Sequence, residues 1–442
     1  VNGDGREDFF VGGAAGQAGA IFLQTADGHF QATKQPALQA DAACEDVDAT
    51  LFDADGDGDL DMYVASGSNE AEPLSEALAD RLYMNDGKGG FTRKVDAVPG
   101  QKPFATACVR PADVDGDGDL DLFVGMRLLP GKVGQPVGGF LLLNDGKGYF
   151  KMQQTEVLKN LGMPTDATWA DVDGDQDPDL IVVGEWMPIR VFINDQGQLR
   201  AAEAGLNQTA GLWKRIMPGD FNGDGKVDFL VGNNGLNSRL EASVQEPLCL
   251  FFNDFDKNGQ PEALLNRYNG GLLLPFALRG DLVSNMPILK KKYLHYKRYV
   301  GQQMTDIFSP EQMQGTVELQ VTTLASGVLL NLGNGQFSLT PLPSEAQFAP
   351  MYGITVGDFD GDGQQDALTG GNFLGNKPEF GYEDADYGLF LKGDGHGGFQ
   401  AERSCQTGFR LAGEVRDIKT VQVGGKRCFL VARNNAGIAV FR

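Results

Sequence analysis

The sequence predicts an all-β fold, a seven-bladed β-propeller of four-stranded blades, and two observations lead to this prediction. An acidic motif recurs along the chain at intervals of about 50 to 60 residues, the usual length of one four-stranded blade. In addition, 61 glycines among 442 residues, with 41% hydrophobic residues, indicate many short strands joined by tight turns. We therefore expect residues 1–442 to form a single propeller domain.

The repeat motif reads Asp-x-Asp/Asn-x-Asp-Gly-x-x-Asp and predicts a loop between two strands. Copies start at residues 53, 113, 171, 220 and 358, spaced 60, 58, 49 and 138 residues apart, and a truncated copy, NGDGRED, opens the chain. Apolar runs such as DMYVASG and DFLVGNN follow the motif and predict buried strands. Later Asn-Asp-Gly or Gly-Asn-Gly turns predict hairpins. Each unit is thus strand, acidic loop, strand, connection, strand, glycine turn, strand.

These signals divide the chain into expected blades at 1–33, 46–95, 104–153, 164–203, 210–342, 350–403 and 411–442. The last lacks both the acidic motif and a fourth strand, and we expect residues upstream of Val1 to complete it and close the ring. The 138-residue interval places an insertion at 236–325, with a further acidic loop, DFDKNGQPE, between strand-like LCLFF and EALL. We predict helices at 281–300 and 310–315, the second capped by Ser309.

The acidic loop has the oxygen ligands that Ca²⁺ prefers. Carboxylates at positions one, three, five and nine point inward, a carbonyl at position seven adds an oxygen, and glycine at position six allows the bend. One such loop is equally well explained as turn chemistry, but five complete copies favour about six or seven structural Ca²⁺ ions. The predicted metal ligands are Asn2, Asp4 and Asp8; Asp53, Asp55, Asp57 and Asp61; Asp113, Asp115, Asp117 and Asp121; Asp171, Asp173, Asp175 and Asp179; Asp220, Asn222, Asp224 and Asp228; Asp254, Asp256, Asn258 and Glu262; and Asp358, Asp360, Asp362 and Asp366.

Composition excludes some classes of partner. The chain has 37 Lys+Arg against 60 Asp+Glu, and a formal charge of −23 argues against nucleic acid binding. No apolar run is long enough for a transmembrane helix. The five cysteines contain no CxxC zinc signature, and disulfides Cys44–Cys108 or Cys405–Cys428 and buried free thiols are all left open.

The motifs DADGDGDLD and DVDGDGDLD resemble FG-GAP (VCBS) repeats, as in the integrin α-subunit propeller and many secreted bacterial proteins. The run from DFDKNG through FALRGDLVSNMPILKKKYLHYKRYV to GEVRDIKTVQVGGKRCFLVARNN resembles surface proteins of gram-negative bacteria related to those with an ASPIC/UnbV segment, a segment that this sequence does not contain. The resemblance implies calcium binding and an extracellular or bacterial cell-surface location, with an outer-membrane lipoprotein as one form. The chain starts inside a motif, so we expect any targeting signal upstream of Val1.

A partner is expected on the propeller face opposite the acidic loops. Polar and aromatic residues follow the second strands of the blades there and are candidates for binding a glycan or a protein, within a larger outer-membrane assembly or alone. Ordinary loop caps explain them equally well. The insertion leaves from this face, and its basic segment KKKYLHYKRY is expected either to pack on the propeller's carboxylates or to meet an acidic partner. The candidate ligand-binding residues are Arg127, Glu185, Trp186, Asn233, Asn234, Arg239, Asn372, Arg433 and Asn434.

We expect a non-catalytic binding or scaffold protein. No Gly-x-Ser-x-Gly, His-Glu-x-x-His or phosphate-loop motif occurs, and two of the three histidines lie inside glycine turns. The alternative is a polysaccharide lyase or glycoside hydrolase that uses Asp166 and Glu185 at the channel. The Arg279-Gly280-Asp281 tripeptide is assigned no function, because Asp281 is predicted to be a helix N-cap.

Overall fold

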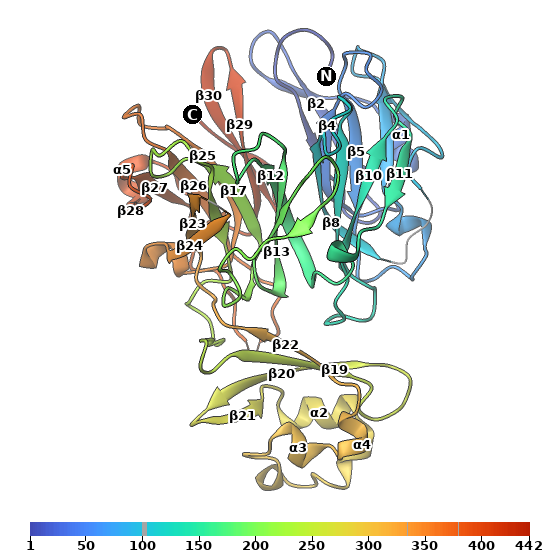
Figure 1. The fold of residues 1–442 in the computed structure, drawn as a ribbon, viewed down its shortest axis with the longest axis vertical. Coiled ribbons are helices and arrows are strands. Elements are labelled where there is room, and N and C mark those ends of the chain that lie inside the picture. The colour runs from blue at the N-terminus through green and yellow to red at the C-terminus, as the bar shows by residue number, and fades with distance from the viewer. Residues whose placement is uncertain (100–103, 334, 379) are drawn as a thin grey trace.

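A computed structural model describes residues 1–99, 104–333, 335–378 and 380–442, and antiparallel sheets that follow one another along the chain dominate it (Figure 1). The first sheet consists of β1 (Phe9–Val11), β2 (Ala20–Gln24) and β3 (Phe30–Ala32). The next two are β4 (Asp46–Phe52), β5 (Asp61–Ser66), β6 (Arg81–Asn85) and β7 (Phe91–Arg93), and β8 (Ala105–Ala112), β9 (Asp121–Leu128), β10 (Gly139–Asn144) and β11 (Phe150–Gln153).

The sheets of the second half follow the same plan. One sheet consists of β12 (Met163–Ala170), β13 (Asp179–Met187), β14 (Arg190–Ile193) and β15 (Arg200–Ala201), and β16 (Gly211–Leu212) also pairs with β13. The sheets after it are β17 (Arg215–Gly219), β18 (Asp228–Gly232), β23 (Gly327–Gly333) and β24 (Gln336–Pro341); β25 (Met351–Gly357), β26 (Asp366–Gly371), β27 (Leu389–Gly393) and β28 (Phe399–Glu402); and β29 (Val415–Val423), β30 (Lys426–Arg433) and β31 (Ala439–Phe441). Short helical turns connect the sheets at α1 (Pro36–Ala40), η1 (Glu76–Leu78), η2 (Glu156–Leu158), η5 (Ser344–Gln347) and α5 (Ser404–Thr407).

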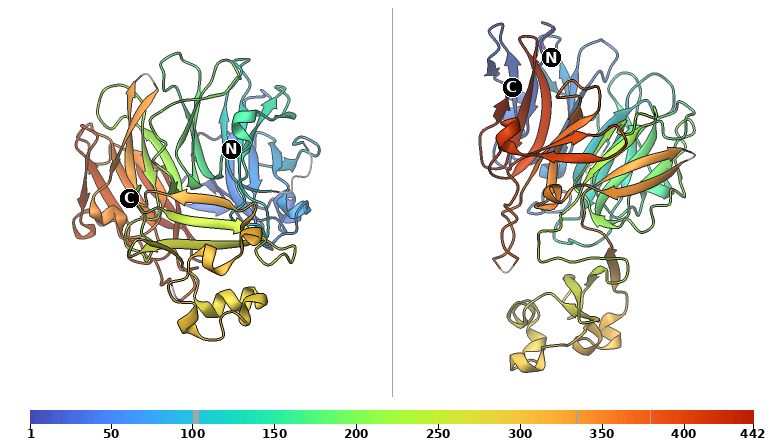
Figure 2. Two further views of the ribbon diagram at one scale, coloured as in Figure 1. Left: turned by 60° about the horizontal axis from the view of Figure 1, so that its bottom comes forward. Right: turned by 90° about the vertical axis from the view of Figure 1, so that its left-hand side faces the viewer.

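These sheets are arranged as a β-propeller. The strands β4, β8, β12, β17, β25 and β29, each the first of its sheet, pack side by side in that order. The first and last sheets also meet, because Gln24 Nε2 donates to the carbonyl of Gln422 at 2.8 Å and Phe9 packs against Val421. Figure 2 shows the sheets grouped around one another with the remaining part of the chain at one end.

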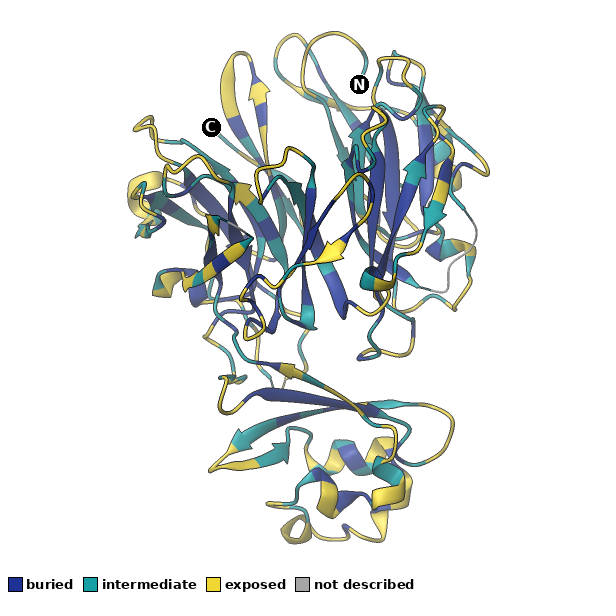
Figure 3. Cartoon of the chain, viewed as in Figure 1, coloured by how far each residue is buried: buried dark blue, intermediate teal, exposed yellow. Residues whose placement is uncertain are grey.

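In the sheets that contain β5, β18 and β26, the second strand is the most buried, as its apolar sequence predicts. Every residue of β5, β18 and β26 is buried, since neighbouring sheets cover both faces of these strands (Figure 3). Continuous apolar runs, rather than alternating ones, suit a strand that is covered on both faces. The first and second strands pair in a register that brings the last Asp of the acidic motif, such as Asp61, opposite Phe52 at the loop.

An additional sheet and several helices lie between β18 and β23. The sheet has the order β21-β20-β19-β22. It is built from β19 (Leu248–Asn253), β20 (Glu262–Asn269), β21 (Leu272–Pro275) and β22 (Val317–Val321), and it carries the helical elements α2 (Arg279–Asn285), η3 (Pro287–Lys290), η4 (Tyr296–Arg298), α3 (Met304–Ile307) and α4 (Pro310–Met313). The apolar residues Phe255, Leu282, Met286, Tyr293 and Phe308 form a core of its own.

Two predictions for this region are wrong. The expected helix at 281–300 is instead the short α2 followed by two 3₁₀ turns, because Pro287 lacks an N–H and disfavours helical backbone at the residue before it. Asp281 is not the N-cap, since α2 starts two residues earlier and Leu278 occupies that position. Ser309 does cap α4, where its hydroxyl accepts from the Gln312 N–H in a capping box.

The five cysteines are unpaired in the structure. Cys44, Cys108, Cys249 and Cys428 are buried, and Cys405 is exposed. No helix in the described ranges is long and apolar enough to cross a membrane.

Candidate functional site

The acidic loops share one backbone design. In the loop between β4 and β5, Asp53 accepts hydrogen bonds from the N–H groups of Gly56 at 2.8 Å and Gly58 at 3.0 Å. Both glycines have positive φ, at 75° and 92°, a conformation that L side chains rarely adopt. The first Asp of the four other complete motifs accepts from the backbone at the same two positions, three and five residues on. Local hydrogen bonding thus folds the loop around its carboxylates.

The last carboxylate of the motif ties the loop to the sheet. Asp61 is 1% exposed, and its two oxygens accept from the N–H of Ala54 at 3.0 Å and of Asn85 at 2.8 Å. Asp121, Asp179, Asp228 and Asp366 repeat this pattern between loop and third strand. Burial raises the pKa of Asp61, Asp121 and Asp179 to about 6, although the backbone N–H groups act in the opposite direction.

Five loops bring three carboxylates together. In each, one oxygen from every residue lies within 4.8 Å of the others. Asp55 Oδ1 and, in the same loop, Asp59 Oδ1 are buried and have no hydrogen-bond partner in the described part of the chain. A set of carboxylate oxygens fits Ca²⁺ rather than a softer metal. The five groups are Asp53, Asp55 and Asp57; Asp113, Asp115 and Asp121; Asp171, Asp173 and Asp179; Asp254, Asp256 and Glu262; and Asp358, Asp360 and Asp366.

Several predicted ligands, Asp360 of the clustered groups among them, lie beside side-chain cations. In the first loop, Arg6 pairs with Asp4. In the loop before β18, Lys226 Nζ is 2.6 Å from Asp224. Lys392 pairs with Asp360 and, at 2.8 Å, with Asp362. These contacts show that the loops attract positive charge.

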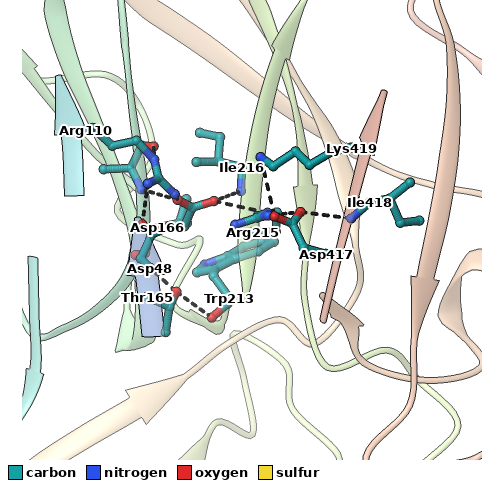
Figure 4. Close-up of polar contacts among 12 residues, drawn as sticks. Asp48, Arg110, Thr165, Asp166, Trp213, Arg215, Ile216, Asp417, Ile418 and Lys419 are labelled. Atoms are coloured by element: carbon teal, nitrogen blue, oxygen red, sulfur yellow. Dashed lines mark hydrogen bonds and ion pairs between the residues drawn. The ribbon is translucent and has the colours of Figure 1, made fainter. Parts of the chain in front are cut away.

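Alternating charges line the innermost strands of the propeller (Figure 4). Arg110 on β8 pairs with Asp48 on β4 and with Asp166 on β12. Arg215 on β17 pairs with Asp417 on β29, and its Nε lies 3.8 Å from Asp166 Oδ2. The chain of ion pairs therefore links five sheets.

Asp166 is the centre of this axial network. It is 1% exposed, and besides the two arginines its carboxylate accepts from the N–H of Ile216 at 3.0 Å and of Ala167 at 2.9 Å. Burial by itself raises the pKa of Asp417, but Arg215 and then Lys419 lower that pKa below its ordinary value. The network is thus a charge-compensated connection between blades.

A second charged cluster lies where the insertion joins the propeller face. Both carboxylate oxygens of Glu185 lie 3.0 Å from Arg127 Nη2, and Lys214 Nζ lies 2.6 Å from Oε1. Burial opposes ionisation of Glu185, yet Arg127 and Lys214 lower its pKa to about 2. Lys214 and Arg416 also lie over the Tyr352 ring, at 5.7 and 4.7 Å from its centroid.

The amides predicted to bind a ligand make internal hydrogen bonds. Asn233 is fully buried, and its Oδ1 accepts from the N–H of Leu212 and Asn234 while Nδ2 donates to Thr323. Asn372 Nδ2 donates to the carbonyl of Asp386 at 2.7 Å.

The remaining candidates are spread across the face. Asn234 donates to Glu383 at 3.1 Å, Asn434 to Glu414 at 2.8 Å, and Arg433 to the Gly437 carbonyl. Trp186 has a φ of 60° and packs with Leu212 and Leu248, whereas Arg239 lies over the Phe276 ring. The structure thus brings Arg127 and Glu185 together but does not gather the nine candidates into one site.

The sequence did not predict that Lys214 pairs with Glu185, nor that Lys214 and Arg416 lie over the Tyr352 ring. A signal for the axial network was present, because Asp48, Asp166 and Arg215 each stand five residues before the first Asp of a motif. That position follows a backbone irregularity in β4 and β12, which turns these side chains toward the axis.

The comparison with protein families decides the nature of the repeat. The model of the FG-GAP-like repeat matches residues 1–64, 53–124 and 171–231. The chain contains FG-GAP-like repeats. The FG-GAP repeats and the β-propeller predicted from the sequence are therefore confirmed.

Curated relatives match only part of the chain. T-cell immunomodulatory protein of Homo sapiens is 26% identical over 232 residues, and that of Rattus norvegicus is 27% identical over 241. Each alignment covers 46% of this chain and 37% of the relative, so the chain spans less than two thirds of their length. Among solved structures, the Dos1 propeller aligns with 98% of this chain and 88% of its own at 9% identity and a TM-score of 0.42. The Vibrio cholerae biofilm matrix protein Bap1 aligns with 99% and 85% at 10% identity and a TM-score of 0.38.

Proposed function

We propose that this FG-GAP repeat protein is a calcium-stabilised, non-catalytic binding or scaffold protein at the cell surface. The main observation in favour of a non-catalytic role is that both candidate catalytic carboxylates are paired with cationic side chains. Asp166 is held between Arg110 and Arg215, and Glu185 between Arg127 and Lys214. A carboxyl group with a pKa of about 2 is not a proton donor near neutral pH, and a carboxylate paired with two cations is a weak base.

We further propose that the propeller has seven blades and that residues 236–325 form an insertion within the fifth blade. In support, the sheet from β1 to β3, the sheet from β29 to β31 and those between them follow one another in chain order. The sheet made of β19 to β22 interrupts only the one that contains β18 and β23. The insertion's separate core, centred on Phe255 and Tyr293, supports the same division.

Calcium is proposed to bind in the acidic loops, with about six or seven ions held by the predicted ligands. The clustered carboxylate oxygens and the unpartnered Asp55 Oδ1 support this assignment. Bound Ca²⁺ would neutralise carboxylates that otherwise repel one another. It would thereby favour the folded loop and the connection that Asp61 makes to the third strand.

The partner is proposed to be a protein or a glycan that binds the face opposite the acidic loops. FG-GAP repeats and the similarity to T-cell immunomodulatory protein favour protein interaction. The cluster of Arg127, Lys214, Arg416 and Tyr352 on this face offers the cationic and aromatic groups that recognition uses. A surface location, including an outer-membrane lipoprotein, agrees with the repeats' resemblance to secreted proteins.

The experiment is a glycan-array and protein-capture screen combined with assays for new reducing ends and unsaturated products. Binding without turnover is the expected result. Turnover that E185Q abolishes would instead establish the alternative, a polysaccharide lyase or glycoside hydrolase. E156Q is the matched control, because Glu156 is an exposed surface acid paired only locally with Lys159.

A further inference from the structure

The outer end of the insertion carries an unusual combination of charge and exposed apolar side chains. Between Asp281 and Asp306 the chain contains Lys290, Lys291, Lys292, Lys297 and Arg298 but no acidic residue, whereas the whole chain has a net charge of −23. We call residues 286–300 the basic tip. It is the strongest local reversal of charge in the sequence.

The basic tip is folded, not merely solvated. Tyr293 is 1% exposed and packs in the insertion core, and Lys292 Nζ donates to the carbonyl of Ile307 at 2.9 Å. Tyr299 donates to the carbonyl of Ala277 at 2.7 Å. Of the two expectations for this segment, packing on the propeller's carboxylates finds no support in the described residues, where the contacts named above lie within the insertion. The remaining cations, Lys290, Lys291, Lys297 and Arg298, are exposed.

Large apolar side chains stand among these cations. Ile288 is 53% exposed, Leu294 61%, Tyr296 64% and Val300 76%. A single exposed apolar residue needs no explanation. Here four such residues lie within 13 positions, in a segment that also supplies buried side chains to the insertion core. This clustering indicates a surface that binds another molecule. Figure 3 shows this lower part of the insertion as mainly exposed.

The basic tip lies away from the propeller's acidic loops, and the acidic loop near it is the insertion's own, whose Phe255 packs in one core with Met286 and Tyr293 of the tip. The insertion and the nearest acidic loop of the propeller leave from opposite ends of β18. The acidic loop comes before the first residue of β18, Asp228, and the insertion comes after its last residue, Gly232. The helices α2 and α3, which flank the tip in the chain, lie beyond the insertion sheet, at the end of the molecule's long axis (Figure 1). Charges separated by more than about 8 Å in solvent are largely screened at physiological ionic strength, so the tip can meet an anionic surface that the body repels.

We propose that the basic tip docks on the surface of an anionic phospholipid bilayer. Exposed lysines and an arginine meet lipid phosphates, while aliphatic side chains and a tyrosine enter the boundary between headgroups and acyl chains. An acidic protein surface would pair with the cations but would leave the apolar side chains of Leu294 and Val300 exposed to water. The combination of both groups therefore favours lipid over an acidic protein.

The test is co-sedimentation of the full chain with vesicles of phosphatidylcholine alone or mixed with phosphatidylglycerol, in buffer containing calcium. The chain is expected to bind the mixed vesicles only, and less at higher salt. Each cation near an anionic membrane surface increases the partition coefficient about five-fold. K290E/K291E/K297E is therefore expected to lower the partition coefficient by about a hundredfold. I288S/L294S/V300S is expected to lower it with less salt dependence. K34E/K88E/K132E, which changes the charge equally at exposed propeller positions, is the control and is expected to retain binding.

Three results would overturn the proposal. Wild-type chain that stays in solution with the mixed vesicles has no lipid-docking surface. Binding that K290E/K291E/K297E leaves intact would come from calcium bridges between acidic loops and lipid. Retention on immobilised polyglutamate, lost in the same variant and without vesicle binding, would assign the tip to an acidic protein. Unchanged melting curves of the variants would show that each result reports on binding rather than folding.

Discussion

Replacing Asp166 with Asn tests whether the axial ion pairs hold the blades together. The substitution keeps the size of the side chain but removes its charge, so Arg110 loses one of its two carboxylates and Arg215 loses the more distant of its two. Removing one partner of a buried ion pair costs about 3 to 5 kcal/mol. Because Asp48 and Asp417 still compensate the two arginines, we expect a loss below that range, about 2 to 3 kcal/mol in the free energy of unfolding.

The assay is urea unfolding of the wild-type chain and of D166N, followed by tryptophan fluorescence in excess calcium. Trp169 and Trp213 lie on or next to the strands that carry the network, so their emission reports on its loss. E156Q is the control, because it removes one charge of an exposed pair and is expected to change the midpoint little. A D166N midpoint equal to that of wild type would refute the view that these charges stabilise the propeller.

Two further changes probe the opposite face. Glu185 has a pKa of about 2 in the folded chain, against an ordinary value of 4.5. Its ion pairs therefore stabilise the fold fully above pH 4.5, and this contribution, up to about 3 kcal/mol, is lost as the pH falls towards 2. E185Q should make the free energy of unfolding less dependent on pH, and an equal slope in both proteins would contradict the assignment. N233A leaves the N–H groups of Leu212 and Asn234 without their acceptor, and it should lower the free energy of unfolding in urea by about 1 to 3 kcal/mol per buried group. N160A, at an exposed position, is the control and should change it little. Equal urea midpoints for N233A and N160A would show that the Asn233 side chain does not stabilise the fold.

The repeat could be predicted from the sequence because its information is local. Each acidic motif fixes a loop through hydrogen bonds between residues three to five positions apart, as Asp53 does with Gly56 and Gly58. The apolar run after it gives a strand that is buried on both faces, as in β5. Spacing is also the basis for the predicted insertion at 236–325, since the 138-residue interval is too long for one blade.

The errors and omissions concern features that spacing does not encode. Pro287 divides the segment expected to be helical. The basic residues that follow it are compatible with a helix, so composition alone did not reveal the break. The axial network escaped prediction because its members, such as Asp48 and Arg110, are 62 residues apart and meet only when neighbouring sheets pack. Asn233 looked like a surface ligand group, but its burial against Thr323 depends on where the insertion returns.

The measurement that tests the central claim most directly is calcium binding to the full chain, counted by elemental analysis after equilibrium dialysis and paired with thermal unfolding. We expect about six or seven ions per chain and a melting temperature that falls substantially in EGTA, since a ligand present at a hundred times its Kd stabilises the fold by about 2.7 kcal/mol per site. D113N/D115N/D117N should lower the count by one. A chain that holds no calcium, with one melting curve in calcium and in EGTA, would contradict the account.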